Sequence, residues 1–251
     1  MAIIISIALQ KGGTGKTSTT IELAACMKAK GYKVLAVDLD QQANLSEYTS
    51  ADSSKPGIYE VLSGTNSLKD VIQHVPEFDV VSSSSKLSKA DREFSDALDV
   101  LKLKKSLRSV NEDYDFIFVD LNPARNVLLN MAYVASDYII IPAEAEEGSL
   151  QGIKAIFHDL QRYKDDGFSE ADILGVILTK YEKTGMHAYM QDKISELLKE
   201  YCPNAFLLTV RKSIVANEAK SEQTSMQVGK HNSKPAEDYR TIADEILKIV
   251  L

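Results

Sequence analysis

The feature that most constrains this chain is the stretch from Gln10 to Ser18, which has the sequence Gln-Lys-Gly-Gly-Thr-Gly-Lys-Thr-Ser. It follows the apolar run 3–8 and opens a helical pattern, so it joins a strand to a helix. Its closely spaced glycines let backbone N–H groups turn inward around an anion, and the helix N-terminus adds its positive dipole end. The stretch is therefore predicted to be a phosphate-binding loop.

Two side chains of this loop have the chemistry that a nucleoside triphosphate requires. We expect Lys16 to reach the β- and γ-phosphates and the hydroxyl of Thr17 to ligate Mg²⁺. The general motif Gly-x-x-x-x-Gly-Lys-[Ser/Thr] has glycine where this chain has Gln10, and an additional lysine, Lys11, stands directly before the glycines. The expected nucleotide-binding residues of the loop are Lys11, Gly12, Gly13, Thr14, Gly15, Lys16, Thr17 and Ser18.

Composition is consistent with a cytoplasmic globular protein. The hydrophobic content of 44% in 251 residues allows a sizeable core, and we expect a single P-loop ATPase domain over residues 1–251. The net charge of −7 gives no sign of a dedicated nucleic-acid binder, so any DNA contact must be local. Cys26 and Cys202 are far apart, which supports neither a disulfide framework nor a metal centre. No run approaches the roughly 18 apolar residues of a membrane span.

Strand-like and helix-like segments alternate with short connections along the chain. This pattern predicts an α/β fold, with a mostly parallel twisted sheet and helices on both faces. The expected strands are 3–8, 33–38, 78–81, 114–120, 138–143, 173–180 and 206–210. The expected helices are 17–30, 67–72, 88–110 and 150–164.

Two aspartates lie at the carboxyl ends of expected strands, where ligands of open α/β sheets bind. Asp120 ends a β-branched and aromatic-rich strand, which is the physical form of a Walker B carboxylate that holds the Mg²⁺ shell. Asp40 lies just past the strand 33–38, and carboxylates beside a triphosphate usually handle metal or water. A role limited to capping a turn remains the alternative for Asp40, because aspartate favours turns in general.

Three motifs together resemble those of a known family. The run Lys-Gly-Gly-Thr-Gly-Lys-Thr from Lys11 resembles the deviant Walker A of the ParA/MinD group of ATPases. The segment 38–44 resembles the group's Asp-x-Asp-Pro-Gln-Gly-Asn, with Gln41 and Ala43 in place of proline and glycine. Asn122 follows the Walker B strand where relatives usually carry a proline. The chain is similar to ParA-type partition ATPases over most of its length, including the family's late helices near 213–219 and 238–246.

The resemblance implies a role for each matching residue. Lys11 would cross a two-fold interface to the partner's phosphates, and Asp40 would orient the attacking water, so the expected catalytic residues are Lys11, Lys16 and Asp40. The expected metal ligands are Thr17, Asp40 and Asp120, with Asp120 also part of the nucleotide site. Purine contacts are expected after two late strands, at Thr179, Lys180, Arg211 and Lys212.

The resemblance also implies a function. The family hydrolyses ATP slowly with Mg²⁺, forms a nucleotide sandwich homodimer, binds DNA without sequence preference and is stimulated by a ParB-type centromere-binding partner. This chain would then segregate plasmid or chromosomal DNA and associate with the nucleoid. The cargo could equally be a mobile element or a protein cluster, because no motif specifies it.

Any DNA face is expected late in the chain. Residues 199–251 hold eight Lys/Arg against seven Asp/Glu, whereas the preceding 198 hold 21 against 29. Val215 stands where relatives often have an arginine, so an ordinary solvated surface is the alternative. The candidate DNA contacts are Arg211, Lys212, Lys220, Lys230 and Lys234.

Two other classes of protein share the phosphate loop. A MinD-like membrane-positioning ATPase would need a basic amphipathic helix at its end, but residues 242–251 have one lysine against two acids, so we expect no membrane contact. The other class is a metabolic P-loop ligase or a nucleotide-switched scaffold. Neither requires Lys11, so the presence of this lysine favours the partition interpretation. Turnover without a small-molecule acceptor would exclude the ligase, and a nucleotide-dependent dimer without hydrolysis would indicate the scaffold.

Overall fold

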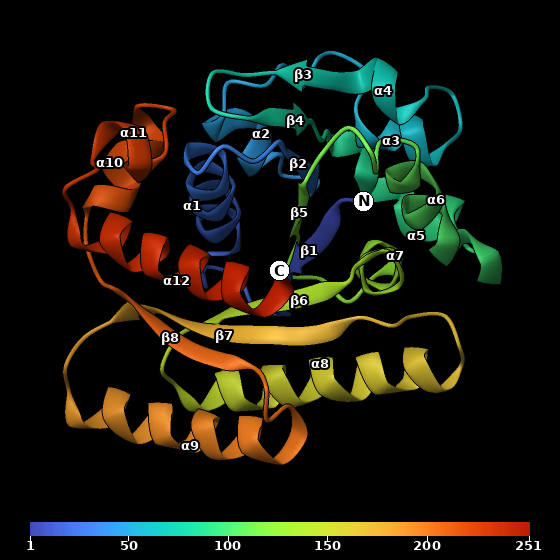
Figure 1. The fold of residues 1–251 in the computed structure, drawn as a ribbon. Helices are drawn as coiled ribbons and strands as arrows, with labels where there is room; N and C mark the ends of the chain where they lie inside the picture. Colours follow the sequence, from blue (N-terminus) through green and yellow to red (C-terminus); the bar gives the residue numbers. More distant parts are fainter.

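The computed structural model describes residues 1–251, and an eight-stranded sheet forms its centre (Figure 1). The strand order is β3-β4-β2-β5-β1-β6-β7-β8, and every neighbouring pair is parallel except β3 and β4. The predicted α/β class is therefore confirmed. The strands are β1 (Ile3–Ile7), β2 (Val34–Leu39), β3 (Ile72–His74), β4 (Asp79–Val81), β5 (Phe116–Leu121), β6 (Tyr138–Ala143), β7 (Asp172–Tyr181) and β8 (Phe206–Arg211).

Helices cover both faces of the sheet, as expected for right-handed crossovers between parallel strands. A core of 28 buried residues joins one face to α1 (Lys16–Ala29), α2 (Asn44–Tyr48), α10 (Val215–Ser221), α11 (Met226–Gly229) and α12 (Lys234–Val250). A core of 42 buried residues joins the other face to α3 (Ile58–Leu62), α4 (Leu68–Val71), α5 (Ala90–Glu93), α6 (Lys102–Arg108), α7 (Val127–Ala135), α8 (Glu147–Asp165) and α9 (Gly185–Tyr201).

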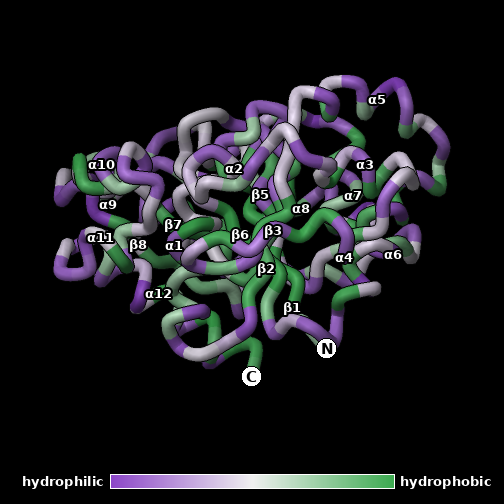
Figure 2. The backbone as a smooth tube through the Cα atoms, turned by 90° about the horizontal axis from the view of Figure 1, so that it is seen from above, coloured by the Kyte–Doolittle hydropathy of each residue, from purple (hydrophilic) through white to green (hydrophobic).

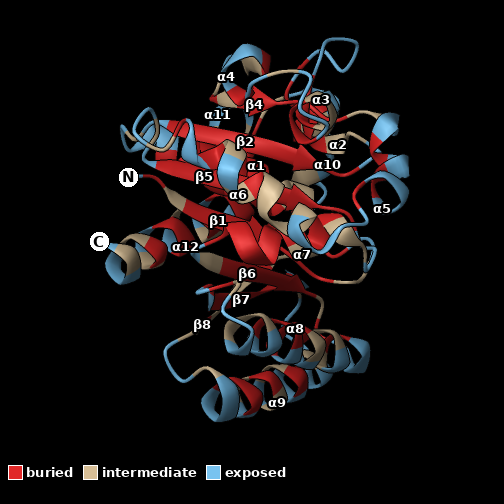
Figure 3. Cartoon of the chain, turned by 90° about the vertical axis from the view of Figure 1, so that its right-hand side faces the viewer, coloured by how far each residue is buried: buried red, intermediate tan, exposed pale blue.

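The pattern of hydropathy explains this layering. The central strands β2 and β5 are buried along their whole length, which accounts for their nearly continuous apolar sequence. Figure 2 shows hydrophobic residues along the strands and hydrophilic residues on the surrounding loops. In Figure 3, helices α8 and α9 bury one side and expose the other, as amphipathic surface helices do. No helix is both long and apolar enough to cross a membrane.

The prediction of one continuous helix over 88–110 is wrong. The segment instead contains α5, the 3₁₀ helix η2 (Ala97–Leu101) and α6, preceded by the 3₁₀ helix η1 (Ser85–Lys89). The break falls at Asp96, which starts η2 in an extended conformation and whose N–H donates to Asp99 at 3.0 Å. Local capping of this kind competes with helix propagation, and Leu98, which lies within η2, is 68% exposed.

Other sequence-based assignments differ from the structure in smaller ways. The predicted helix 67–72 is the shorter α4, which runs directly into the unpredicted edge strand β3. Helices α7 and α9 were also not predicted, although α9 has an amphipathic pattern and a Thr184 hydroxyl cap at its N-terminus. The predicted late helices correspond to α10 and α12, with α12 longer than expected.

A buried carboxylate joins α1 to α11. Glu22 accepts hydrogen bonds from the Met226 N–H at 2.8 Å and from Nε2 of Gln227 at 3.0 Å. Burial raises the pKa of Glu22 to about 7, in part opposed by these two hydrogen bonds, and the charge of Glu77 raises it further. Glu77 in turn accepts a 2.7 Å hydrogen bond from the Ser225 N–H. The short helix α11 is thus anchored at its start by two carboxylates.

The raised pKa of Glu22 predicts a pH-dependent stability. The folded state binds a proton at Glu22 up to about pH 7, whereas the unfolded chain releases it near pH 4.5, so this contribution to stability is present at low pH and is lost as pH rises. The free energies of unfolding of the parent and of Glu22→Gln, measured by chemical denaturation, should therefore change differently with pH. We expect the parent to lose about 2 kcal/mol relative to Glu22→Gln between about pH 5 and pH 8. A constant difference over that range would contradict the assignment.

Candidate functional site

The phosphate-binding loop lies between β1 and α1 at the carboxyl edge of the sheet. Gly13 and Gly15 have φ angles of +77° and +89°, a conformation that favours glycine. Gly15 precedes α1 without any side-chain cap, so the first N–H groups of the helix are left for another acceptor. The buried hydroxyl of Thr14 also has no hydrogen-bond partner. These features fit a cradle for the phosphates of a nucleotide.

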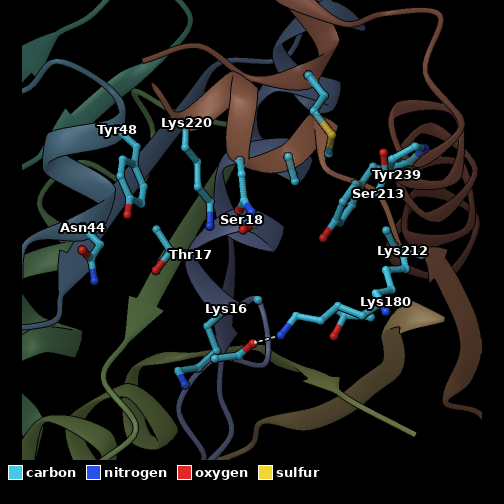
Figure 4. Close-up of a pocket in the computed structure, with 18 of the residues that line it drawn as sticks. Lys16, Thr17, Ser18, Asn44, Tyr48, Lys180, Lys212, Ser213, Lys220 and Tyr239 are labelled. Atoms are coloured by element: carbon cyan, nitrogen blue, oxygen red, sulfur yellow. Dashed lines mark hydrogen bonds between the residues drawn. The ribbon is translucent and has the colours of Figure 1, made fainter. Parts of the chain in front are cut away.

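A cavity of about 970 Å³ opens in front of this loop (Figure 4). Its wall combines the loop and the start of α1 with residues that follow β2, β5, β7 and β8, and with α10. The predicted residues Asp40, Thr179, Lys180, Arg211 and Lys212 all line it, together with Gly12, Gly13, Gly15, Lys16, Thr17 and Ser18. Segments far apart in the sequence therefore meet at one site.

The lysines of the loop are held by local partners. The buried Lys16 donates from Nζ to the Lys11 carbonyl at 2.7 Å. Burial lowers the pKa of Lys16, and the charges of Asp120 and Asp40 oppose that shift. The Lys11 side chain forms an ion pair with Glu146 at the start of α8. Both side chains of that pair are partly exposed, so the ion pair contributes little to stability.

Asp120 and Thr17 form the centre of the candidate metal site. The Thr17 hydroxyl donates to Oδ2 of Asp120 at 2.7 Å, and the Thr20 hydroxyl approaches its other oxygen at 3.4 Å. Asp120 is fully buried, and burial raises its pKa, with the charge of Asp38 acting in the same direction. Hydroxyl and carboxylate oxygens are the ligands that Mg²⁺ prefers, so this pair fits the predicted cation.

Asp38 also belongs to the buried carboxylate cluster at the site, although the sequence alone did not single it out. It lies opposite Asp120 in the register of β2 and β5, and it is also fully buried. Its carboxylate accepts from the Ser46 N–H at 2.9 Å, from the Ser46 hydroxyl at 2.7 Å and from the Asp40 N–H at 3.0 Å. Asp38 thereby fixes the loop that carries Asp40. The signal was present as a pair of aspartates two positions apart.

Asp40 caps a turn and lines the cavity at once. Its Oδ1 accepts from the Gln42 N–H at 2.9 Å, and its carbonyl accepts from the Ser83 hydroxyl at 2.6 Å. Ala43 has φ +54° in the same turn, which is a left-handed conformation where relatives have glycine, and which costs an alanine about 1 kcal/mol. After β5, Asn122 accepts from the Ala124 N–H at 3.0 Å and forms a turn where relatives have proline.

The four residues predicted to contact the purine differ in their surroundings. The buried Thr179 donates its hydroxyl to the Thr14 carbonyl at 2.9 Å, so it supports the phosphate loop from behind. Lys180 pairs with Glu144 at 2.7 Å and donates to the Gly13 carbonyl at 2.9 Å, the contact drawn as a dashed line in Figure 4. Arg211 and Lys212 lie beside the end of β7, where the Lys212 N–H donates to the Tyr181 carbonyl at 3.1 Å. Their side chains pair with carboxylates, Arg211 with Glu237 and Asp238, and Lys212 with Glu182.

A parallel sheet with a glycine-rich loop, a lysine at the helix start and a buried threonine–aspartate pair defines a P-loop ATPase. Residues 2–173 match a family model described as an AAA domain. The sporulation initiation inhibitor protein Soj of Bacillus subtilis is 28% identical over 98% of both chains. The chromosome partitioning protein ParA of Caulobacter vibrioides is 30% identical over 72% of this chain and 70% of its own.

Solved structures give the same result. A plasmid partition protein of Borrelia burgdorferi bound to AMPPNP has a TM-score of 0.83 and is 27% identical, with all of both chains covered. An ATP complex of Cyanothece McdA has a TM-score of 0.87 at 22% identity, over 98% of this chain and 96% of that one. The chain belongs to the ParA family, in the ParA/MinD group of P-loop ATPases. It is thus an ATPase with ATP and Mg²⁺ as its ligands, as the sequence predicted.

Proposed function

We propose that this chain is a DNA partition ATPase that forms a homodimer when it binds ATP. The observation that carries the proposal is the position of Lys11, a partly exposed lysine on the outer side of the phosphate loop, with only a weak surface ion pair to restrain it. A lysine there can leave Glu146 and reach the phosphates of a second copy across a two-fold axis. The plasmid partition protein of Borrelia and the partition relatives of Bacillus and Caulobacter support this choice.

Within each site, the residues divide the work of phosphoryl transfer to water. Lys16 would give up its bond to the Lys11 carbonyl and bind the β- and γ-phosphates. Asp40, held by the turn at Gln42, would orient the attacking water. Thr17 and Asp120 would hold Mg²⁺, which neutralises charge on the phosphates when bound. Lys11 of a partner would add a cation where charge develops.

Substitutions should separate binding from hydrolysis. Lys16→Ala removes a cation that faces the phosphates, so we expect ATP affinity to fall at least about tenfold in equilibrium binding. Asp40→Ala should bind ATP like the parent and lose about a hundredfold in steady-state hydrolysis, because it lacks the group that positions water. If Asp40→Ala hydrolysed ATP at the parent rate, the proposed role in positioning water would be wrong, and Asp40 would serve only to cap the turn.

Assembly should depend on both ATP and Lys11. In the Asp40→Ala background, which preserves bound ATP, light scattering should show a dimer with ATP and Mg²⁺ and a monomer with ADP. Lys11→Ala in that background should return a monomer, because each site loses the cation supplied by its partner. A dimer that forms without nucleotide and survives Lys11→Ala would contradict the proposal.

Most of the candidate DNA-binding cations are paired with carboxylates or line the cavity. Three of the five candidate cations, Arg211, Lys212 and Lys220, line the cavity, and the Lys220 side chain points into it and away from the expected DNA face. Arg211 and Lys212 pair with neighbouring carboxylates, and Lys230 pairs with Glu218 and Glu222. Lys234 at the start of α12 is exposed and has no ion-pair partner. We propose that two copies of this weakly basic face act together in the dimer, bring the protein to the nucleoid, and await a ParB-type partner that stimulates hydrolysis.

DNA binding should therefore require the dimer. Fluorescence anisotropy with unrelated duplexes of equal length should show ATP-dependent binding of similar affinity for each. The slope of log K against log salt should be about −0.9 per phosphate contact, and Lys234→Gln should make it shallower. Absence of binding to every duplex at low salt with ATP would contradict the DNA role and favour the positioning of a protein cargo.

A membrane-positioning role has less support. Ile242, Ala243 and Ile246 of α12 are buried in the core against the sheet. The apolar side of this terminal helix is therefore occupied by the protein itself.

A further inference from the structure

Lys220 occupies an unusual position in the cavity. It lies near the end of α10, and its side chain passes between Tyr48 and Ser18 toward Thr17 (Figure 4). Its ammonium group lies over the Tyr48 ring, 5.3 Å from the centroid. The side chain is half-buried, and no carboxylate or hydrogen-bond acceptor is within bonding distance of its ammonium.

The other lysines that line the cavity are all partnered. Lys16 donates to a loop carbonyl, Lys180 pairs with Glu144, and Lys212 pairs with Glu182. A cation removed from water without a partner costs free energy, and a cation–π contact returns only about 0.5–2 kcal/mol. Burial accordingly lowers the pKa of Lys220, while the charge of Asp120 opposes that shift. Lys220 is therefore the one cavity lysine whose ammonium has neither a hydrogen-bond acceptor nor an ion-pair partner.

The direction of the side chain identifies the class of anion. Thr17 and Ser18 form the first turn of α1, where the helix dipole and free N–H groups favour phosphate. Lys220 points at that turn from α10, whereas Lys11 lies at the other end of the loop beside Glu146. A DNA phosphate outside the protein could not be reached by a side chain that points into the cavity.

We propose that Lys220 contacts the phosphate chain of the bound nucleotide, as a cation that α10 supplies within the same chain. Tyr48 is a positioning residue in this arrangement, because its ring holds the ammonium at the cavity wall. Since Tyr48 belongs to α2, which follows the Asp40 loop, the contact joins the nucleotide to α2 and α10 at once.

Equilibrium binding tests this contact directly. ADP would displace a fluorescent ATP analogue from the parent, from Lys220→Met and from Lys220→Arg, each checked for folding by circular dichroism. We expect Lys220→Met to bind ADP about tenfold more weakly, and Lys220→Arg to stay within about threefold of the parent. Lys248→Met is the matched control, since it removes an exposed lysine that pairs with Glu245 far from the cavity wall. Equal ADP affinity in Lys220→Met and Lys248→Met would overturn the proposal.

A second measurement uses the unmodified protein and so does not depend on a variant that folds. Reductive methylation followed by mass spectrometry should show ADP protecting Lys220, with Lys248 labelled equally in both conditions. Equal labelling of Lys220 with and without ADP would overturn the proposal. A parent chain that binds no ADP would instead contradict the assignment as an ATPase, so the two failures are distinguishable.

Discussion

Two buried carboxylates at the centre of the sheet determine how the site is built. Asp38 and Asp120 are opposite each other in neighbouring parallel strands, which lie about 4.8 Å apart. Burial raises the pKa of both carboxylates, the charge of Asp38 raises that of Asp120 further, and the charge of Asp40 acts on both in the same direction, so their ionised forms require donors or cations nearby. Ser46 and the Asp40 N–H satisfy Asp38, whereas Thr17 and the charge of Lys16 act on Asp120. The Asp40 loop and the phosphate loop are thereby attached to one charge cluster.

This arrangement explains why the loops around the cavity carry so many internal contacts. Lys16 and Lys180 both donate hydrogen bonds to backbone carbonyls of the phosphate loop. Both ammonium groups could exchange these carbonyls for the oxygens of a bound anion. Thr179 supports the same loop through the Thr14 carbonyl. A bound phosphate chain would replace these weak internal acceptors with charged ones, and charge-assisted hydrogen bonds are roughly twice as strong. The phosphate loop therefore already has the shape that binds phosphate, and the two lysines that hold it can transfer their hydrogen bonds to the phosphates.

The sequence predicted those parts of the fold that depend on local pattern. The strands from β1 to β8 were placed closely, except β3, because buried parallel strands are nearly continuous apolar runs. The break at Asp96 was missed because capping at one residue overrode the apolar spacing of the segment 88–110. The edge strand β3 has only Ile72, Gln73 and His74, which is too short for any alternating pattern. The proposed extent of one domain over residues 1–251 stays a prediction.

The sequence predicted those parts of the candidate site whose residues belong to one contiguous motif. It did not predict the residues that only the fold brings to the site. Residues 11–18 are contiguous, so their common role follows from spacing alone. Lys220 is far from them in sequence, and counting charges put it on an outer face, because only the packing of α10 shows that its side chain enters the cavity. The supporting role of Asp38 depends on the register of β2 with β5, which no local pattern states.

The loop between β1 and α1 is expected to receive the phosphates through its backbone N–H groups. Hydrogen–deuterium exchange with and without ATP and Mg²⁺ measures those groups directly, using peptides that cover residues 10–18. We expect exchange in these peptides to slow markedly when nucleotide is bound, and exchange in peptides from α9 to stay unchanged. Unaltered exchange over residues 10–18 at a saturating nucleotide concentration would contradict it.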